Sequence, residues 1–138
     1  MIVLPLEAEA EAKTRFVLLR WRAWEVQVPN YDAPSWHLMG FLSEEHCAKV
    51  SSALAQVSPV GDEARSKTGS VYSLSSPPGF DEDAARLWAS WQRQHGVVVL
   101  REVTAELLAG RQPRPVHLIR RTALAEDLAA SLRGRRKW

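Results

Sequence analysis

Cysteine and long apolar runs are scarce in this sequence. Cys47 is its single cysteine, so no internal disulfide can form, and nothing else indicates an oxidising compartment. No apolar run approaches the roughly 20 residues of a membrane-spanning helix. The opening run 1–6 is too short for a signal peptide and is followed at once by acidic residues. These absences predict a soluble protein that is located in the cytoplasm and has no membrane partner.

Familiar catalytic motifs are absent as well. No glycine-rich loop of nucleotide-binding form precedes a helix. The triplet Lys67-Thr68-Gly69 occurs in penicillin-binding enzymes, but the Ser-x-x-Lys and Ser-Asp-Asn motifs that this chemistry also needs are missing. These residues are therefore expected to form a turn. His46 and Cys47 are adjacent, and because neighbours on a strand point to opposite faces, they are not expected to form a catalytic pair.

Metal ligands at short, zinc-type spacing are also missing. The acidic run 81–83 could suggest acid catalysis or a divalent-metal site, but acids at the start of a helix are what its dipole favours. The run is therefore interpreted as helix capping. The sequence predicts no cofactor and no metal site. No set of acids, bases and nucleophiles converges, so an enzyme of unknown class is the third hypothesis, behind two kinds of binding protein.

The composition predicts one globular domain with three segments. The chain has 138 residues, of which 46% are apolar and 25% charged, which is typical of a protein with a single core. Glutamates alternate with alanines near the start, so residues 1–14 are expected to form an acidic arm. Residues 15–110 carry the apolar patterns of an α+β core domain. Residues 111–138 are predicted to form a basic C-terminal helix and tail.

Alternating apolar residues predict the strands of the core. The pattern over 15–28 changes phase near Ala23 and Trp24, which indicates a bulge or two strands run together. Further strands are expected at 36–40, 50–57, 64–66 and 71–74. Gly69 suits the hairpin turn between the last two, because glycine takes positive φ without steric cost.

Three helices and one more strand are expected in the second half. The clearest is 81–95, with Asp81 as its N-cap, Gly96 as its end and Trp88 on its apolar stripe. The apolar run 97–100 is expected to be a central strand. Thr104 could cap a short helix over 105–109. The predicted fold is α+β: an antiparallel sheet or small partly open barrel of roughly four to six strands, packed against the Trp-bearing helix at about 81–95, with a C-terminal helix at about 116–133.

Residues 36–104 resemble a family of small uncharacterised proteins encoded by bacterial phages and other mobile elements. The matching features, in order, are Trp36-His37-Leu38-Met39-Gly40, Val50-Ser51-Ser52, Lys67-Thr68-Gly69-Ser70-Val71-Tyr72-Ser73-Leu74, Pro77-Pro78-Gly79, and a helix carrying Trp88 and Trp91. These are structural residues, so the resemblance implies a genomic setting and no activity. The acidic arm and the basic segment lie outside it.

The basic residues are concentrated near the C-terminal end. Residues 111–138 hold eight basic side chains against two acidic ones, a net charge of +6, whereas residues 1–110 hold ten against fourteen, a net charge of −4. Clustered guanidinium groups attract phosphates over a Debye length of about 10 Å, which a surface of mixed charge does not. The predicted nucleic-acid-binding residues are Arg111, Arg114, Arg120, Arg121, Arg133, Arg135, Arg136 and Lys137.

Three interpretations of this basic segment stay open. It could bind nucleic acid or another polyanion, it could bind an acidic protein, or it could dock on the acidic remainder of the chain. In the last case Arg120 and Arg121 would pair with acids of the arm or of 81–83. The favoured hypothesis is a non-catalytic accessory protein of a phage or mobile element that binds nucleic acid through this segment. The alternative is a protein–protein interaction module or an inhibitor of a host system, which would use an exposed sheet edge or an aromatic patch.

Overall fold

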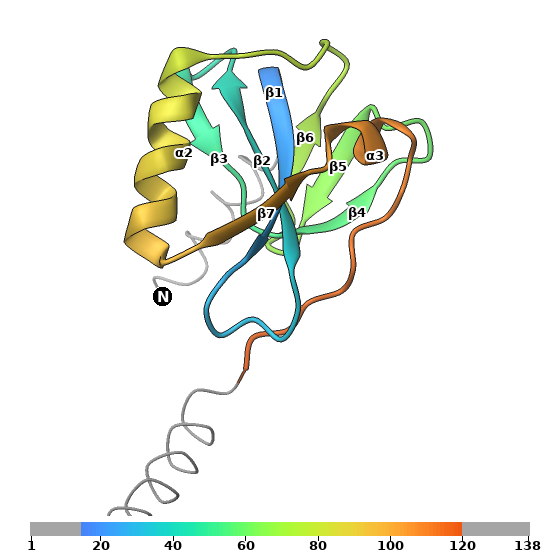
Figure 1. Ribbon diagram of the computed structural model, residues 1–138. Helices are drawn as coiled ribbons and strands as arrows, with labels where there is room; N and C mark the ends of the chain where they lie inside the picture. Colours follow the sequence, from blue (N-terminus) through green and yellow to red (C-terminus); the bar gives the residue numbers. More distant parts are fainter. Residues whose placement is uncertain (1–14, 120–138) are drawn as a thin grey trace, which may run out of the picture.

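The structure is a computed structural model and describes residues 15–119 (Figure 1). The predicted acidic arm, 1–14, and residues 120–138 lie outside the described residues. Its elements, in chain order, are β1 (Arg15–Gln27), β2 (Ser35–Leu42), β3 (Cys47–Val50), β4 (Leu54–Val57), β5 (Glu63–Ser66), β6 (Val71–Ser73), α2 (Glu82–His95), β7 (Val98–Glu102) and α3 (Thr104–Leu108). The chain is α+β, as expected.

The strands form one seven-stranded mixed sheet in the order β3-β2-β1-β6-β5-β4, with β7 paired to β1. Strand β1 is long enough to pair with β2 along one side and with both β6 and β7 along the other. The expectation of a purely antiparallel sheet is wrong, because β1 and β6 run parallel. β3 and β4 end the strand order, and no described pairing joins them. The sheet is therefore open and not a closed barrel.

The register of β1 shifts on both sides of the predicted place, Ala23 and Trp24. Against β2 it breaks between Leu19 and Arg22, where Arg20 has a positive φ of 49°, and against β7 it breaks between Glu25 and Val26. Across Ala23 and Trp24 the strand alternates regularly. Ala23 and Trp24 are both apolar because β1 is covered on both faces at that point. The prediction took these two adjacent apolar residues as a phase change, although they lie on opposite faces of a regular strand.

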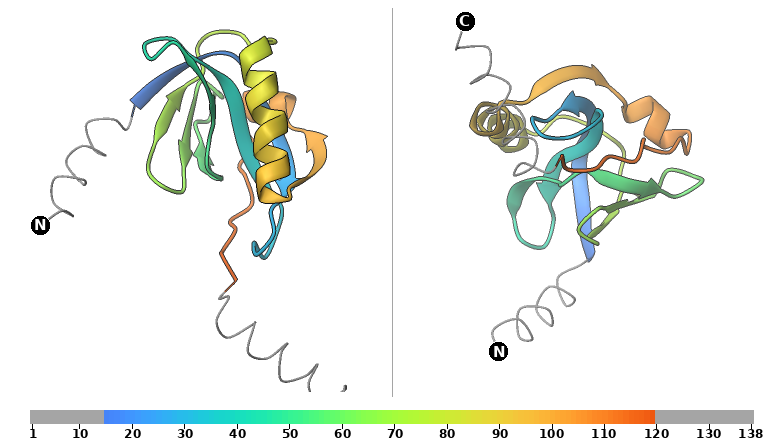
Figure 2. Two further views of the ribbon diagram at one scale, coloured as in Figure 1. Left: turned by 90° about the vertical axis from the view of Figure 1, so that its left-hand side faces the viewer. Right: turned by 90° about the horizontal axis from the view of Figure 1, so that it is seen from below.

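Two apolar clusters fill the two sides of β1. The first lies between β1–β2 and β4–β6 and includes Trp21, Leu38 and Tyr72. The second lies under α2, where Val26 and Trp88 are buried and Trp24 and Trp91 pack partly buried against them. Figures 1 and 2 both place α2 and β4–β5 on opposite sides of β1. Five tryptophans, Trp21, Trp24, Trp36, Trp88 and Trp91, lie in these clusters or pack against them.

Helix α2 begins and ends where its sequence predicts. The Asp81 side chain accepts a hydrogen bond from the backbone N–H of Ala84 at 2.9 Å, as an N-cap does. Gly96 takes the left-handed conformation at φ 62° and closes the last turn. The helix buries Ala84 and Trp88 against the sheet, while Leu87 is 37% exposed.

Three local predictions are wrong. The apolar stretch 50–57 is two strands, β3 and β4, which lie at opposite ends of the strand order and are separated by Ser51–Ala53. Strand β7 is not central, since it pairs only with β1 among the described strands and is largely exposed. Thr104 is inside α3 and does not cap it; its hydroxyl accepts from the backbone N–H of Ala23 and donates to Glu102.

Two glycines allow α3 to dock against the β4–β5 turn. Gly61 in the turn has φ 74°, and Gly110 after α3 has φ 79°. A Cβ at Gly61 would lie 2.6 Å from the carbonyl oxygens of Leu107 and Leu108, so the two backbones meet directly. This contact sets the direction in which the chain leaves α3 toward Arg111. Within residues 15–119, no helix combines the length and the apolar character needed to cross a membrane.

Candidate polyanion-binding surface

Residues 111–119, called the strap here, run along the β4 end of the sheet (Figure 1). The Gln112 side chain pairs with both backbone groups of Val57: it accepts from the N–H at 2.9 Å and donates to the carbonyl at 2.7 Å. Pro113 is buried, and Val116 is 4% exposed. A side-chain amide thus occupies the hydrogen-bonding groups of an edge strand, and two apolar side chains hold the strap on the core.

Beyond Val116 the strap reaches the loop between β1 and β2. The Lys67 ammonium donates to the Val116 carbonyl at 2.7 Å. The backbone N–H of His117 donates to the Asp32 carboxylate at 2.8 Å, and this bond lowers the pKa of that carboxyl. Leu118 forms an isolated bridge with Tyr31. The expectation of a helix from 116 is therefore wrong for 116–119, where backbone groups bond to the 30–32 loop; its remainder, 120–133, lies outside the described residues.

Only two of the predicted binding residues are in the described part of the chain. Arg111 and Arg114 are both exposed on the strap, and neither forms an ion pair with a described carboxylate. The other predicted residues lie outside the described residues: Arg120, Arg121, Arg133, Arg135, Arg136 and Lys137.

The described part of the chain is electrically balanced. Residues 15–119 contain eleven basic and eleven acidic side chains, and two of the basic ones, Arg111 and Arg114, belong to the strap. Most of these acids already have an arginine partner, and the pairs are Arg15–Glu63, Arg20–Asp81, Arg22–Glu102, Arg86–Glu82, Arg86–Asp83, Arg101–Glu25 and Arg101–Glu106.

These ion pairs occupy acids on which the basic segment could otherwise dock within its own chain. Asp81, one of the acids expected to receive Arg120 or Arg121, caps α2 and lies 2.9 Å from Arg20. Asp83 lies 2.6 Å from Arg86. Docking at 81–83 would therefore have to displace existing partners.

Six cations form no ion pair with a described carboxylate, and four of them are near the strap. Arg65 is exposed on β5 opposite Gln56 of β4, Lys67 contacts Val116, and Arg111 and Arg114 belong to the strap. The remaining two are Lys49 and Arg93. Sequence reasoning missed Arg65 and Lys67, although the alternation Ala64-Arg65-Ser66, with Arg65 alone exposed, was visible as a strand pattern.

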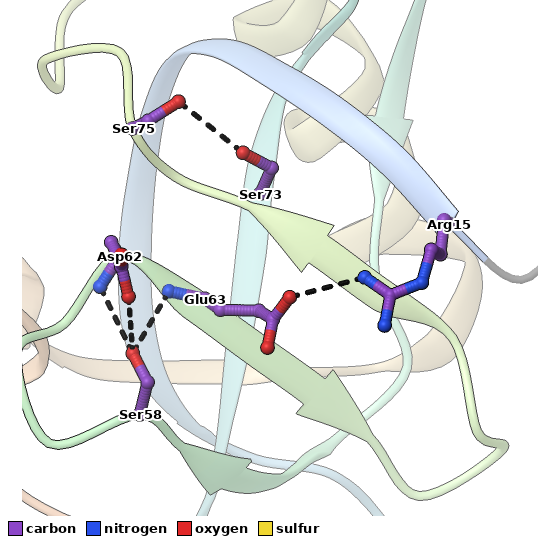
Figure 3. Close-up of polar contacts among 6 residues, drawn as sticks. All are labelled: Arg15, Ser58, Asp62, Glu63, Ser73 and Ser75. Carbon is purple, nitrogen blue, oxygen red and sulfur yellow. Dashed lines mark hydrogen bonds and ion pairs between the residues drawn. The ribbon is translucent and has the colours of Figure 1, made fainter.

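A hollow of about 230 Å³ lies on β4–β5 and is lined in part by Ser58, Glu63 and Arg65. Figure 3 shows why its acids are not available: Glu63 reaches Arg15 at 3.2 Å, and the Ser58 hydroxyl donates to Asp62 at 2.8 Å while accepting from the backbone N–H groups of Asp62 and Glu63. The Ser58 hydroxyl thus donates to a carboxylate while its oxygen accepts two backbone N–H groups, an arrangement that holds the turn between β4 and β5.

Within residues 15–119, a serine and a histidine are hydrogen-bonded side chain to side chain in the interior. His37 is 2% exposed beside Trp91, and its Nδ1 lies 3.0 Å from the Ser51 carbonyl. Because a carbonyl only accepts, Nδ1 carries the proton and Nε2 accepts from the Ser35 hydroxyl at 2.7 Å. Ser35 is 1% exposed, so its hydroxyl is not presented to a substrate. The pair satisfies buried polar atoms and joins β2 to the Ser51 loop.

His37 makes the stability of the protein depend on pH. Burial lowers the pKa of His37 from 6.5 to about 4. Between these values the unfolded chain binds a proton that the folded chain does not, so lowering the pH over this range favours unfolding. The free energy of unfolding should fall by about 3 kcal/mol from this group and level off below the folded pKa. Urea denaturation at a series of pH values measures it.

The matched control is His37→Gln, because glutamine can donate to the Ser51 carbonyl and accept from Ser35 without titrating. Its free energy of unfolding should show a shallower pH dependence, by up to one proton, over the same range. Equal slopes in the two proteins would contradict the assignment.

Residues 15–119 contain no group of three or more His, Cys, Asp or Glu side chains placed to hold a metal ion. No family model, curated protein or solved structure matches the chain. The arrangement of charges on the described surface is therefore the observation from which a function can be argued.

Proposed function

We propose that the protein is a non-catalytic accessory protein of a phage or mobile element that binds duplex nucleic acid through its basic C-terminal segment. The observation that carries the proposal is the internal pairing of the acids of residues 15–119. Seven of the eleven acids of residues 15–119 have an arginine partner, which leaves Asp32, Glu44, Glu45 and Asp62 without one. Arg111 and Arg114 are exposed at its start.

The residue type suits this ligand. Seven of the eight cations in 111–138 are arginines, whose planar guanidinium makes bidentate contacts with phosphate that lysine cannot make. Each phosphate that is neutralised releases condensed counterions, which gives affinity for duplexes of any sequence. The proposal is therefore for sequence-independent binding that weakens steeply with salt.

A titration of the full chain against fluorescently labelled duplex DNA tests the proposal. Anisotropy should rise at low salt, with similar affinity for two duplexes of unrelated sequence. Dextran sulfate should compete with the duplex if the protein recognises only negative charge, and a neutral dextran should not. Absence of binding at about 50 mM salt, where phosphate contacts are strong, would contradict the proposal.

A second candidate function, a protein–protein interaction module, is favoured by strand β7. Val98 is 59% exposed and Leu100 49% exposed, and among the described strands β7 pairs with β1 alone. An extended strand of a partner protein could add to this edge. A protein partner that is held after nuclease treatment and lost on Val98→Lys would support this function over the first.

A further inference from the structure

We propose that Arg65, Lys67 and Arg114 form a phosphate-contact surface on the folded domain itself, called the β4-edge surface here. This inference rests on the proposed function and extends it: duplex nucleic acid would also contact the folded domain, at β5 and the strap, through cations that the fold holds in place.

The three cations are brought together by non-local contacts. Arg65 is opposite Gln56 in the β4–β5 pair. The strap contacts β4 at Val57 through Gln112, then Lys67 through Val116, so Arg114 lies between these two contacts. The strap is therefore the next chain beyond β4, which itself is next to β5.

β4 separates the backbones of Arg65 and Arg114. Arg65 lies on β5, which pairs with β4, and Arg114 lies on the strap, which the Gln112 side chain ties to Val57. Both side chains are exposed and flank one four-residue strand, so they can contact the same stretch of phosphate backbone.

The polar groups around these cations leave them available. Lys67 gives one donor to the Val116 carbonyl, and an ammonium has others to offer a phosphate oxygen. The nearest described acids along β5 are engaged elsewhere, since Glu63 pairs with Arg15 and Asp62 bonds to Ser58 (Figure 3). Tyr31, whose ring lies 5.7 Å from the Lys67 ammonium, is half-buried next to the strap and borders the surface.

The test compares two double variants of the full chain with the same net charge. Arg65→Gln with Arg114→Gln removes two cations of the β4-edge surface. The control, Lys49→Gln with Arg93→Gln, removes the two cations that also lack a described ion pair but lie on β3 and α2. Lys67 is left intact because it holds the strap. Circular dichroism confirms that both variants fold.

The β4-edge variant should bind duplex DNA about tenfold more weakly, and its slope of log affinity against log salt should be smaller by about 1.8, the value for two phosphate contacts. The control should keep the slope of the unaltered chain. Equal losses in the two variants would overturn the β4-edge surface while leaving the proposed function standing. No binding by the unaltered chain would contradict the proposed function and this inference together.

Discussion

A chain that ends at Ile119 should bind duplex DNA at least about a hundredfold more weakly than the full chain at low salt. The truncation removes six of the eight cations of the basic segment and lowers its net charge by four. A protein that makes six or more phosphate contacts loses roughly a thousandfold in affinity between 50 and 200 mM salt. Removing most of those contacts should have an effect of similar size, which fluorescence anisotropy with labelled duplex measures.

The position of the truncation follows from the contacts of the strap. Cutting before Arg111 would also remove Gln112, which occupies the backbone groups of Val57, and the buried Val116. Weak binding would then have two explanations, lost charge and lost structure. The chain that ends at Ile119 keeps these contacts, so its free energy of unfolding should match that of the full chain. Unchanged affinity in this variant would contradict binding through the basic segment.

Gly61→Ala should lower the free energy of unfolding by about 3 kcal/mol or more. A non-glycine residue at positive φ costs about 1 to 3 kcal/mol. The added Cβ would also lie 2.6 Å from the backbone oxygens of Leu107 and Leu108, and backbone can move away only if α3 shifts. The expected result is partial undocking of α3 and loss of the contacts that start the strap.

Gly69→Ala is the matched control, because Gly69 has φ 97° but a Cβ there would have no atom within 4 Å. It should cost about 1 kcal/mol, from strain alone. Urea denaturation followed by tryptophan fluorescence measures both. Equal losses in the two variants would mean that backbone strain, and not the contact of Gly61 with α3, accounts for the effect.

The sequence predicted best where the signal is local. Helix α2 was predicted almost to the residue because its cap at Asp81, its apolar stripe and its terminal Gly96 all lie within one turn of the residues that they fix. The hairpin around Gly69 was predicted for the same reason. Where the outcome depends on which faces are covered, as at Ala23 and Trp24, the alternation of apolar residues was misread.

The sheet order and the strap could not be predicted from local pattern. The apolar pattern of 50–57 does not show that residues 51–53 separate two strands that lie far apart in the sheet. The apolar pattern of 97–100 likewise does not show that β7 lies at an edge. Nothing in the sequence near Gln112 indicates that its amide pairs with Val57, 55 positions away. Charge density singled out Arg111 and Arg114, whereas Arg65 and Lys67 join the candidate surface only because the strap lies beside β4.

The most direct test of polyanion binding is the dependence of duplex affinity on salt for the full chain. The account predicts a straight line of log affinity against log salt with a slope of about −5 or steeper, as expected when six or more phosphates are neutralised. Two duplexes of unrelated sequence should give the same line. A slope near zero, or binding that survives high salt, would contradict the account.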